Sequence, residues 1–197
     1  KRPLLGVLFA FGIFSVHSQV DLTATGGTMN ASYTTVSAAF AAVNAGTHTG
    51  TISINITGNT SEPATPAALS ASGVGTTSFT SLVIKPTVPA VISGAPGAGS
   101  GVLTFNGSDN VTIDGSIAPG GTTRDLTIEN TNAAANTAAI RLIGQTTAGT
   151  GLGVSNFSIL NNIIIGSTSG NNGSSGNTIT TTYGIYAGSS AATTMSS

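Results

Sequence analysis

The sequence predicts an all-β fold in which short strands stack as the coils of a parallel β-helix. One motif of alternating apolar and polar residues, closed by Gly or Asn, recurs along the chain. Between Gly94 and Asn161 the closing residue returns every 8 to 17 residues, which is too short for helical crossovers but suits a strand followed by a corner. The clearest copies are DNVTIDG at 109–115, RDLTIEN at 124–130, AAIRLIG at 138–144 and SNFSILN at 155–161.

Each copy is expected to place two apolar residues on one inward face, because alternate side chains of a strand point to opposite faces. Three earlier segments fit the same pattern: ISINITG at 52–58, VPAVISG at 88–94 and GVLTFNG at 101–107. After the predicted loop at 59–78, SLVIKP at 81–86 is the first segment to resume it. The expected inward pairs are Ile54/Ile56, Ala90/Ile92, Leu103/Phe105, Val111/Ile113, Leu126/Ile128, Ile140/Leu142 and Phe157/Ile159. The closing Gly or Asn accepts a left-handed backbone, which lets a short strand turn sharply. Stacked coils would bury one continuous apolar column.

Composition excludes several classes of protein. Charged residues make up 6% of the chain and the net charge is −1. Beyond the extreme N-terminus the bases are Lys85, Arg124 and Arg141, so no basic patch is available to bind nucleic acid. There is no Cys, which excludes disulfides and thiolate metal sites. Abundant Ile, Val and Thr placed in alternation argue against disorder.

Residues 1–18 have the features of a signal peptide. Lys1 and Arg2 give a positive start, an apolar run follows, and small or compact residues precede Gln19. The apolar run is shorter than the roughly 20 residues of a bilayer span, so we expect cleavage before Gln19 and no membrane span afterwards. The expected location is therefore extracellular, either secreted or at the cell surface.

Residues 19–50 are expected to lead into the fold through a Gly-rich stretch and one amphipathic helix, predicted over 33–46. Its Ala residues favour helix, and Asn44-Ala45-Gly46 supplies a stop. The apolar face comprises Tyr33, Val36, Phe40 and Val43. We interpret this helix as a lid over the first coil, whose apolar column and strand edge would otherwise meet water. A partner-docking role is the weaker alternative.

Residues 51–197 are expected to form the coils, which we expect to continue in a longer protein. Loops rich in Gly, Pro, Ser and Thr should interrupt the strands at coil corners, where solenoids usually carry their binding surfaces. These loops are predicted at 59–78, 117–123 and 167–178, and the last strand is TYGIYAG at 182–188.

The order of these segments is similar to that in a known family. A leader ending before Gln19, a Gly-Gly-Thr stretch, the helix YTTVSAAFAAVNAG, the strand GTISINITGN and then VLTFNGSDNVTIDG resemble the N-terminal region of secreted β-helix proteins of the Bacteroidetes phylum. The resemblance covers residues 20–188 and implies the pectin-lyase-like superfamily of right-handed β-helices. It also implies export, often by the type IX secretion system, and often within a much longer adhesin-like chain.

The resemblance also raises an enzymatic alternative, a polysaccharide lyase or glycoside hydrolase acting on acidic plant or algal polysaccharide. Such enzymes carry clustered acidic residues on one face, with Ca²⁺ and a basic residue in lyases or paired aspartates in hydrolases. Asp114 and Glu129 hold the same place in successive copies, so they could sit on strands about 4.8 Å apart, and Arg141 is the basic candidate. The plainer interpretation makes both acids corner residues that bind turn amides, with Arg124 and Arg141 as outward partners.

A metal or cofactor is not expected. His17 lies in the leader and His48 stands alone, so neither a catalytic triad nor a histidine metal site can be assembled. Ca²⁺ held by Asp109 or Asp114 is the weaker alternative. We therefore favour a non-catalytic exported module with a structural or adhesive role. Its expected partners are glycans or other cell-surface components, bound through corner loops, and further coils of the same chain.

Overall fold

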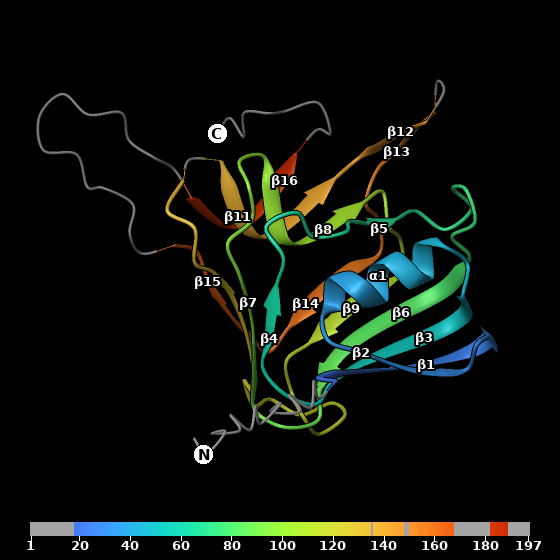
Figure 1. Ribbon diagram of the computed structural model, residues 1–197, viewed down its shortest axis with the longest axis horizontal. Coiled ribbons are helices and arrows are strands. Elements are labelled where there is room, and N and C mark those ends of the chain that lie inside the picture. Colours follow the sequence, from blue (N-terminus) through green and yellow to red (C-terminus); the bar gives the residue numbers. More distant parts are fainter. Residues whose placement is uncertain (1–17, 135, 148–149, 168–181, 189–197) are drawn as a thin grey trace, which may run out of the picture.

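A computed structural model describes residues 18–134, 136–147, 150–167 and 182–188. Within these residues the chain is mostly β-strand with one short helix, so the all-β prediction is confirmed (Figure 1). The predicted signal peptide, most of the predicted loop at 167–178 and the segment after Gly188 lie outside the described residues.

Within the described residues the fold consists of three larger sheets, here named A, B and C, and one two-stranded sheet. Sheet A has the order β14-β9-β6-β3-β1-β2, sheet B β15-β10-β7-β4, and sheet C β16-β11-β8-β5. The strands of sheet A are β1 (Val20–Gly27), β2 (Asn30–Tyr33), β3 (His48–Ile56), β6 (Phe79–Pro86), β9 (Val111–Asp114) and β14 (Phe157–Leu160). Those of sheet B are β4 (Thr60–Glu62), β7 (Ala90–Gly94), β10 (Leu126–Asn130) and β15 (Asn162–Ile165), and those of sheet C are β5 (Leu69–Ser70), β8 (Ser100–Asn106), β11 (Thr137–Ile143) and β16 (Thr182–Gly188).

From β3 onward the chain visits sheets A, B and C in turn, and it repeats this circuit until β16. Each strand pairs in parallel with the strand laid down in the same sheet one circuit earlier. In Figure 1 sheet A lies at the lower right, sheet B at the left and sheet C at the top. A two-stranded hairpin, β12 (Gln145–Thr147) and β13 (Thr150–Leu152), projects between β11 and β14.

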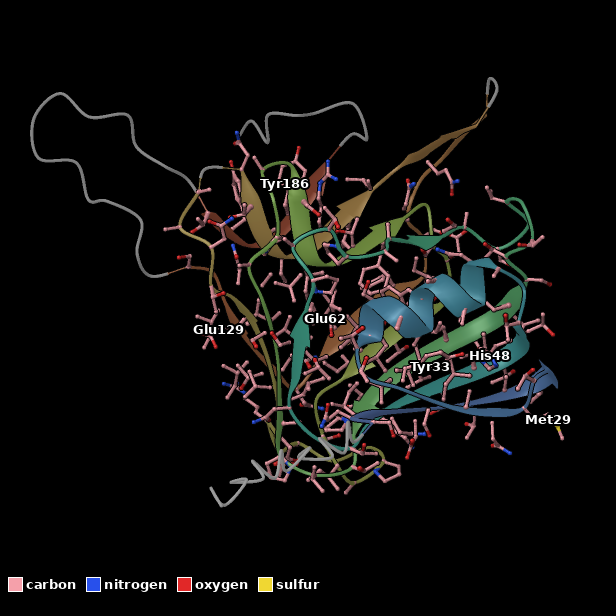
Figure 2. The ribbon with its side chains drawn as sticks, viewed as in Figure 1. Met29, Tyr33, His48, Glu62, Glu129 and Tyr186 are labelled. Atoms are coloured by element: carbon pink, nitrogen blue, oxygen red, sulfur yellow. The ribbon has the colours of Figure 1, made fainter. Side chains whose placement is uncertain are left out.

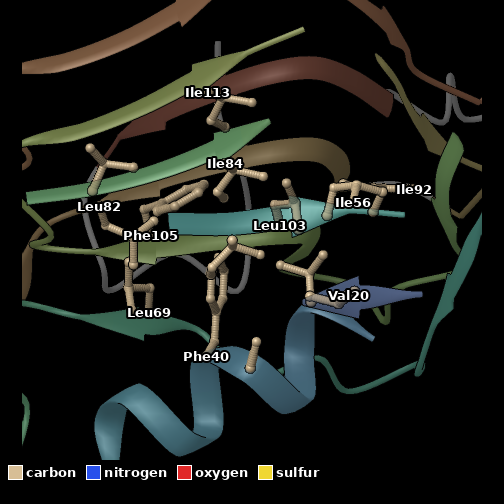
Figure 3. Close-up of a cluster of buried hydrophobic side chains, with 14 of the residues drawn as sticks. Val20, Phe40, Ile56, Leu69, Leu82, Ile84, Ile92, Leu103, Phe105 and Ile113 are labelled. Carbon is tan, nitrogen blue, oxygen red and sulfur yellow. The ribbon is translucent and has the colours of Figure 1, made fainter. Parts of the chain in front are cut away.

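The inward register predicted from the sequence is confirmed. In sheet A, Ile54 pairs with Ile84 and Ile84 with Ile113; in sheet B, Ile92 pairs with Ile128. All five side chains are fully buried in one core to which all three sheets contribute. Figure 3 shows several members of this core between the ribbons. Leu142, Phe157, Ile159 and Ile164, which belong to later strands, are packed against the core but only partly buried.

The closing Gly and Asn residues stabilise the corners by three different means, of which the sequence predicted only the left-handed backbone. Asn161 has the expected positive φ, at 57°, but Gly115 and Asn130 are not left-handed. Gly115 is needed for space, because a Cβ there would collide with the carbonyl oxygen of Asn161 on the next circuit. Asn130 acts through its side chain, which donates to Thr137 Oγ1 at 2.9 Å and accepts from the Asn132 amide at 2.9 Å.

The start of the chain differs most from the prediction. The Gly-rich stretch is a hairpin of β1 and β2, and β1 pairs antiparallel with β3. The predicted loop at 59–78 contains the short strands β4 and β5. The helix α1 (Val36–Asn44) begins three residues later than predicted, since Tyr33 belongs to β2. The buried apolar residues of α1 join the core, where the rings of Phe40 and Phe105 lie 5.5 Å apart.

Candidate functional site

The three residues of the enzymatic alternative lie in three different sheets. Asp114 ends β9 in sheet A, Glu129 is in β10 of sheet B, and Arg141 is in β11 of sheet C. Strand β9 pairs with β6 and β14, and β10 pairs with β7 and β15, so the two acids are not on paired strands. The expected spacing of one strand between Asp114 and Glu129 is therefore not found. Figure 2 shows Glu129 on the outer side of the left-hand sheet.

Asp114 is engaged within its own corner. It accepts hydrogen bonds from the Ser116 amide at 3.0 Å, from Ser116 Oγ at 2.8 Å and from Asn161 Nδ2 at 3.2 Å. Burial tends to raise the pKa of Asp114, but these hydrogen bonds and the charge of Lys85 outweigh it and hold the pKa below its ordinary value. An ionised carboxylate that accepts several hydrogen bonds stabilises the corner. This agrees with the interpretation of Asp114 as a corner residue that binds turn amides.

Two other carboxylates also accept hydrogen bonds from backbone amides and from Ser or Thr hydroxyls. Asp109 accepts from the amide and the hydroxyl of Ser155, both at 2.7 Å. Asp125 accepts from the Ile117 amide at 3.1 Å and from Thr123 Oγ1. Asp109 precedes β9 and Asp114 ends it, so this strand separates the two Ca²⁺ candidates. Among the described residues no three His, Asp or Glu side chains are grouped as a metal site would require.

Arg141 alternates with the inward Ile140 and Leu142, so it lies on the outward face of β11, but it is not solvated there. Its side chain is only 8% exposed, and in sheet C it lies in register between Thr104 and Tyr186. Burial lowers its pKa from the ordinary value, and the phenol of Tyr186 acts in the opposite direction. The prediction of an exposed Arg141 was wrong because β16, which belongs to a later circuit, brings an aromatic residue alongside it. Alternation within one strand cannot reveal that neighbour.

Glu62 is a structural carboxylate whose role the sequence interpretation missed, since it fell in a predicted loop. It is buried at the end of β4, and its two oxygens accept from the amides of Val36 at 3.0 Å and Ser37 at 2.8 Å. These are amides of the first turn of α1, which have no partner inside the helix. Figure 2 shows Glu62 beside this end of the helix. Burial raises the pKa of Glu62, although its hydrogen bonds oppose the shift.

His48 is a structural residue. It is fully buried at the start of β3, where Nε2 is hydrogen-bonded to the hydroxyl of Tyr33 at 2.6 Å and Nδ1 to the carbonyl of Thr28 at 2.5 Å (Figure 2). Burial also raises the pKa of Tyr33. Both partners belong to the hairpin of β1 and β2, so the imidazole ties that hairpin to the main sheet. Neither ring nitrogen is left to serve as a general base or a metal ligand.

One pocket of about 540 Å³ opens where the last circuit passes from sheet C to sheet A. Its lining comes from the ends of β11 and β16 and the start of β14, and includes Leu142, Ile143, Val154, Phe157 and Ala187. Asn156 contributes a polar side chain, but its Nδ2 already donates to Asn110 Oδ1 at 2.6 Å. The pocket is therefore apolar and lacks the convergent polar groups that orient a sugar.

The last circuit is also the edge of all three sheets. Strands β14, β15 and β16 each pair with an earlier strand on one side, and no described strand pairs with the other side. Each carries an exposed large apolar residue: Leu160 is 48% exposed, Ile163 41% and Ile185 46%. This end of the molecule, here called the open edge, gathers half of the exposed large apolar side chains of the described chain.

Comparison with known proteins gives no match, whether with protein-family models, with curated proteins or with solved structures. Within the described residues no helix is long and apolar enough to cross a membrane.

Proposed function

We propose that the chain is a right-handed parallel β-helix whose first coil is closed by α1 and the hairpin of β1 and β2. The repeated circuit through sheets A, B and C supports this fold. So does the corner before sheet A, where Asn156 stacks on Asn110, 46 residues earlier, and both have a positive φ. Parallel strands of one sheet are joined by right-handed crossovers in almost all proteins, which supports the handedness.

The function we propose is that of a non-catalytic, exported module with a structural or adhesive role. The observation that carries this proposal is the use of the acidic side chains. Asp109, Asp114, Asp125 and Glu62 all accept hydrogen bonds that hold corners or the helix in place. Asp114, Glu129 and Arg141 are distributed over three sheets, so the three residues of the enzymatic alternative do not form one site.

Export is supported by the predicted signal peptide and by the sequence resemblance to secreted β-helix proteins. An adhesive role would use the corner loops, such as residues 117–123, to bind glycans or other surface components weakly. Hydroxyl and amide groups of Ser, Thr and Asn at such corners provide hydrogen bonds to sugar hydroxyls. No aromatic platform is among the exposed large apolar side chains of the described residues, so we expect affinity to be low and to depend on many repeats.

Incubation with a panel of pectins and algal polysaccharides tests the absence of catalysis. We expect neither reducing ends nor unsaturated products, and the same result for Asp114→Asn. Product release by the wild-type chain that Asp114→Asn abolishes would replace our proposal with the lyase or hydrolase alternative. Binding is tested on a glycan array with the chain displayed in many copies, and export by fractionating cells that produce the chain with its leader intact.

A further inference from the structure

We propose that the open edge is an interface for a further three-strand coil, added in parallel to β14, β15 and β16. This inference rests on the proposed fold and names the partner that the stack would bind. The partner is an extended segment with the repeat pattern of this chain, one strand for each sheet, with an apolar residue over each inward position.

The backbone identifies the partner as strand-forming. Edge strands present a row of unpaired amides and carbonyls, and another strand satisfies them best. Here three edges lie at the same end of three sheets that share one core. A hairpin or a single peptide could cover only one of them. A segment that follows the same A, B, C circuit can pair with all three.

The burial of the inward column points to the same partner. In sheet C, Leu103, Ile140 and Ile185 are in register one above another, and they are 1%, 0% and 46% exposed. The column thus continues to the edge, where its last member is uncovered. The apolar pocket over Leu142 and Phe157 lies at the neighbouring corner, where the next circuit would pass from sheet C to sheet A.

The opposite end of the stack shows what a closed end looks like. There α1 places Phe40 and Val43 in the core, and the hairpin of β1 and β2 covers the edge of β3. Their charged and polar anchors, Glu62 and His48, are fully engaged. In sheets B and C this end finishes in β4 and β5, and α1 lies over both. Glu62 of β4 accepts from the first-turn amides of α1, and the amide of Ser70 in β5 donates to Asn44 Oδ1 at 3.0 Å, so the helix occupies the position that strands of a second copy would need. Head-to-tail stacking of copies is therefore disfavoured, and a further coil is the better partner.

The experiment uses the absence of Cys, which makes Ile185→Cys the single thiol of the full chain. An extension that copies residues 107–143, a corner followed by the strands of one circuit, is added after Ser197. The matched control extension carries Asp in place of the copied Ile113, Ile128 and Ile140. We expect the first extension to slow thiol labelling at position 185 by about tenfold or more and the control extension to leave it unchanged.

A second thiol position and a second extension make the result decisive. Met29→Cys, at an exposed position in the turn between β1 and β2 at the opposite end of sheet A, should label at the same rate in every version, and amide protection of β3 and β6 should not change. A copy of residues 71–106 should act like the first extension. Unchanged labelling at position 185 with both copies would overturn the proposal. So would slower labelling of the unextended chain at higher concentration, which would assign the edge to a second copy. Polysaccharide cleavage in the earlier assay would refute the proposed function without affecting this result.

Discussion

The carboxylate of Glu62 accepts a 2.8 Å hydrogen bond from the amide of Ser37, 25 residues earlier in the chain. A second bond, from the amide of Val36, completes the link between β4 and the first turn of α1. Thr35 caps the same turn, accepting from the Ala38 amide at 3.1 Å. The N-terminus of the helix is thereby held by one local and one distant side chain.

Replacing Glu62 by Ala should therefore destabilise the fold. It leaves two buried amides without an acceptor, and we expect a loss of about 1 to 3 kcal/mol in the free energy of unfolding. Glu129→Ala is the matched control, because that half-buried carboxylate makes no such contact with a helix, and its cost should stay within about 0.5 kcal/mol. Urea unfolding of the two variants makes the comparison, and equal losses would contradict the assigned role of Glu62.

The raised pKa of Glu62 also predicts a pH dependence. In the unfolded chain Glu62 takes up its proton at the ordinary pKa, and in the folded chain it does so at a higher pH. Its contribution to stability is thus fully present below the unfolded pKa and is lost as the pH rises through the folded pKa. We expect the melting temperature of the wild type to fall relative to that of Glu62→Gln over this interval. Parallel melting curves against pH would show that burial does not shift this group.

Asp114 should show the opposite sign. Its folded pKa lies below the unfolded value, so its contribution is present above the unfolded pKa and is lost as the pH falls through the folded pKa. Asp114→Asn should therefore lower the melting temperature at neutral pH and remove part of the acid sensitivity. Asp21→Asn, at an exposed carboxylate bonded to Ser32 Oγ at 2.7 Å, is the control and should change little. A purely catalytic Asp114 would leave the melting temperature unchanged.

The inward column predicts a contrast between neighbours in the same strand. Ile113→Ala or Ile128→Ala should cost about 2 to 5 kcal/mol, because a packed core relaxes poorly around a cavity. Thr112→Ala and Thr127→Ala, on the outward face, should cost less than about 1 kcal/mol. Chemical denaturation of the four variants measures the difference. Similar losses for both pairs would contradict the register.

The sequence was sufficient to predict the strands in which apolar and polar residues alternate. It was insufficient to predict strands and contacts that depend on residues of neighbouring circuits. The pattern of β9, β10 and β11 is local, so their inward residues could be read directly. Strand β5 has only two residues, and its pairing of Leu69 with Phe105 depends on a segment far along the chain. Two residues are too few to show a period.

The site residues follow the same division. The role of Asp114 as a corner acceptor could be predicted, because its partner Ser116 is two residues away. The burial of Arg141 and of Glu62 depends on Tyr186 and on α1, which are brought near only by the completed fold. The separation of Asp114 from Glu129 depends on which sheet receives each strand, and successive copies of one motif do not reveal that.

Close stacking of corners gives the sharpest prediction. Gly115 has an ordinary φ, but a Cβ at this position would strike the backbone carbonyl of Asn161, which cannot move without disturbing β14 and β15. Gly115→Ala should therefore cost about 1 to 3 kcal/mol, as other overpacking substitutions do. Gly153→Ala is the matched control, since a Cβ there meets nothing within 4 Å, and it should be neutral within about 0.5 kcal/mol. Because the clash lies between two circuits, Gly115→Ala should also speed amide exchange in β14 and β15 more than in β3. Unfolding and exchange measurements on the two variants test this, and a neutral Gly115→Ala would show that these corners are not in contact.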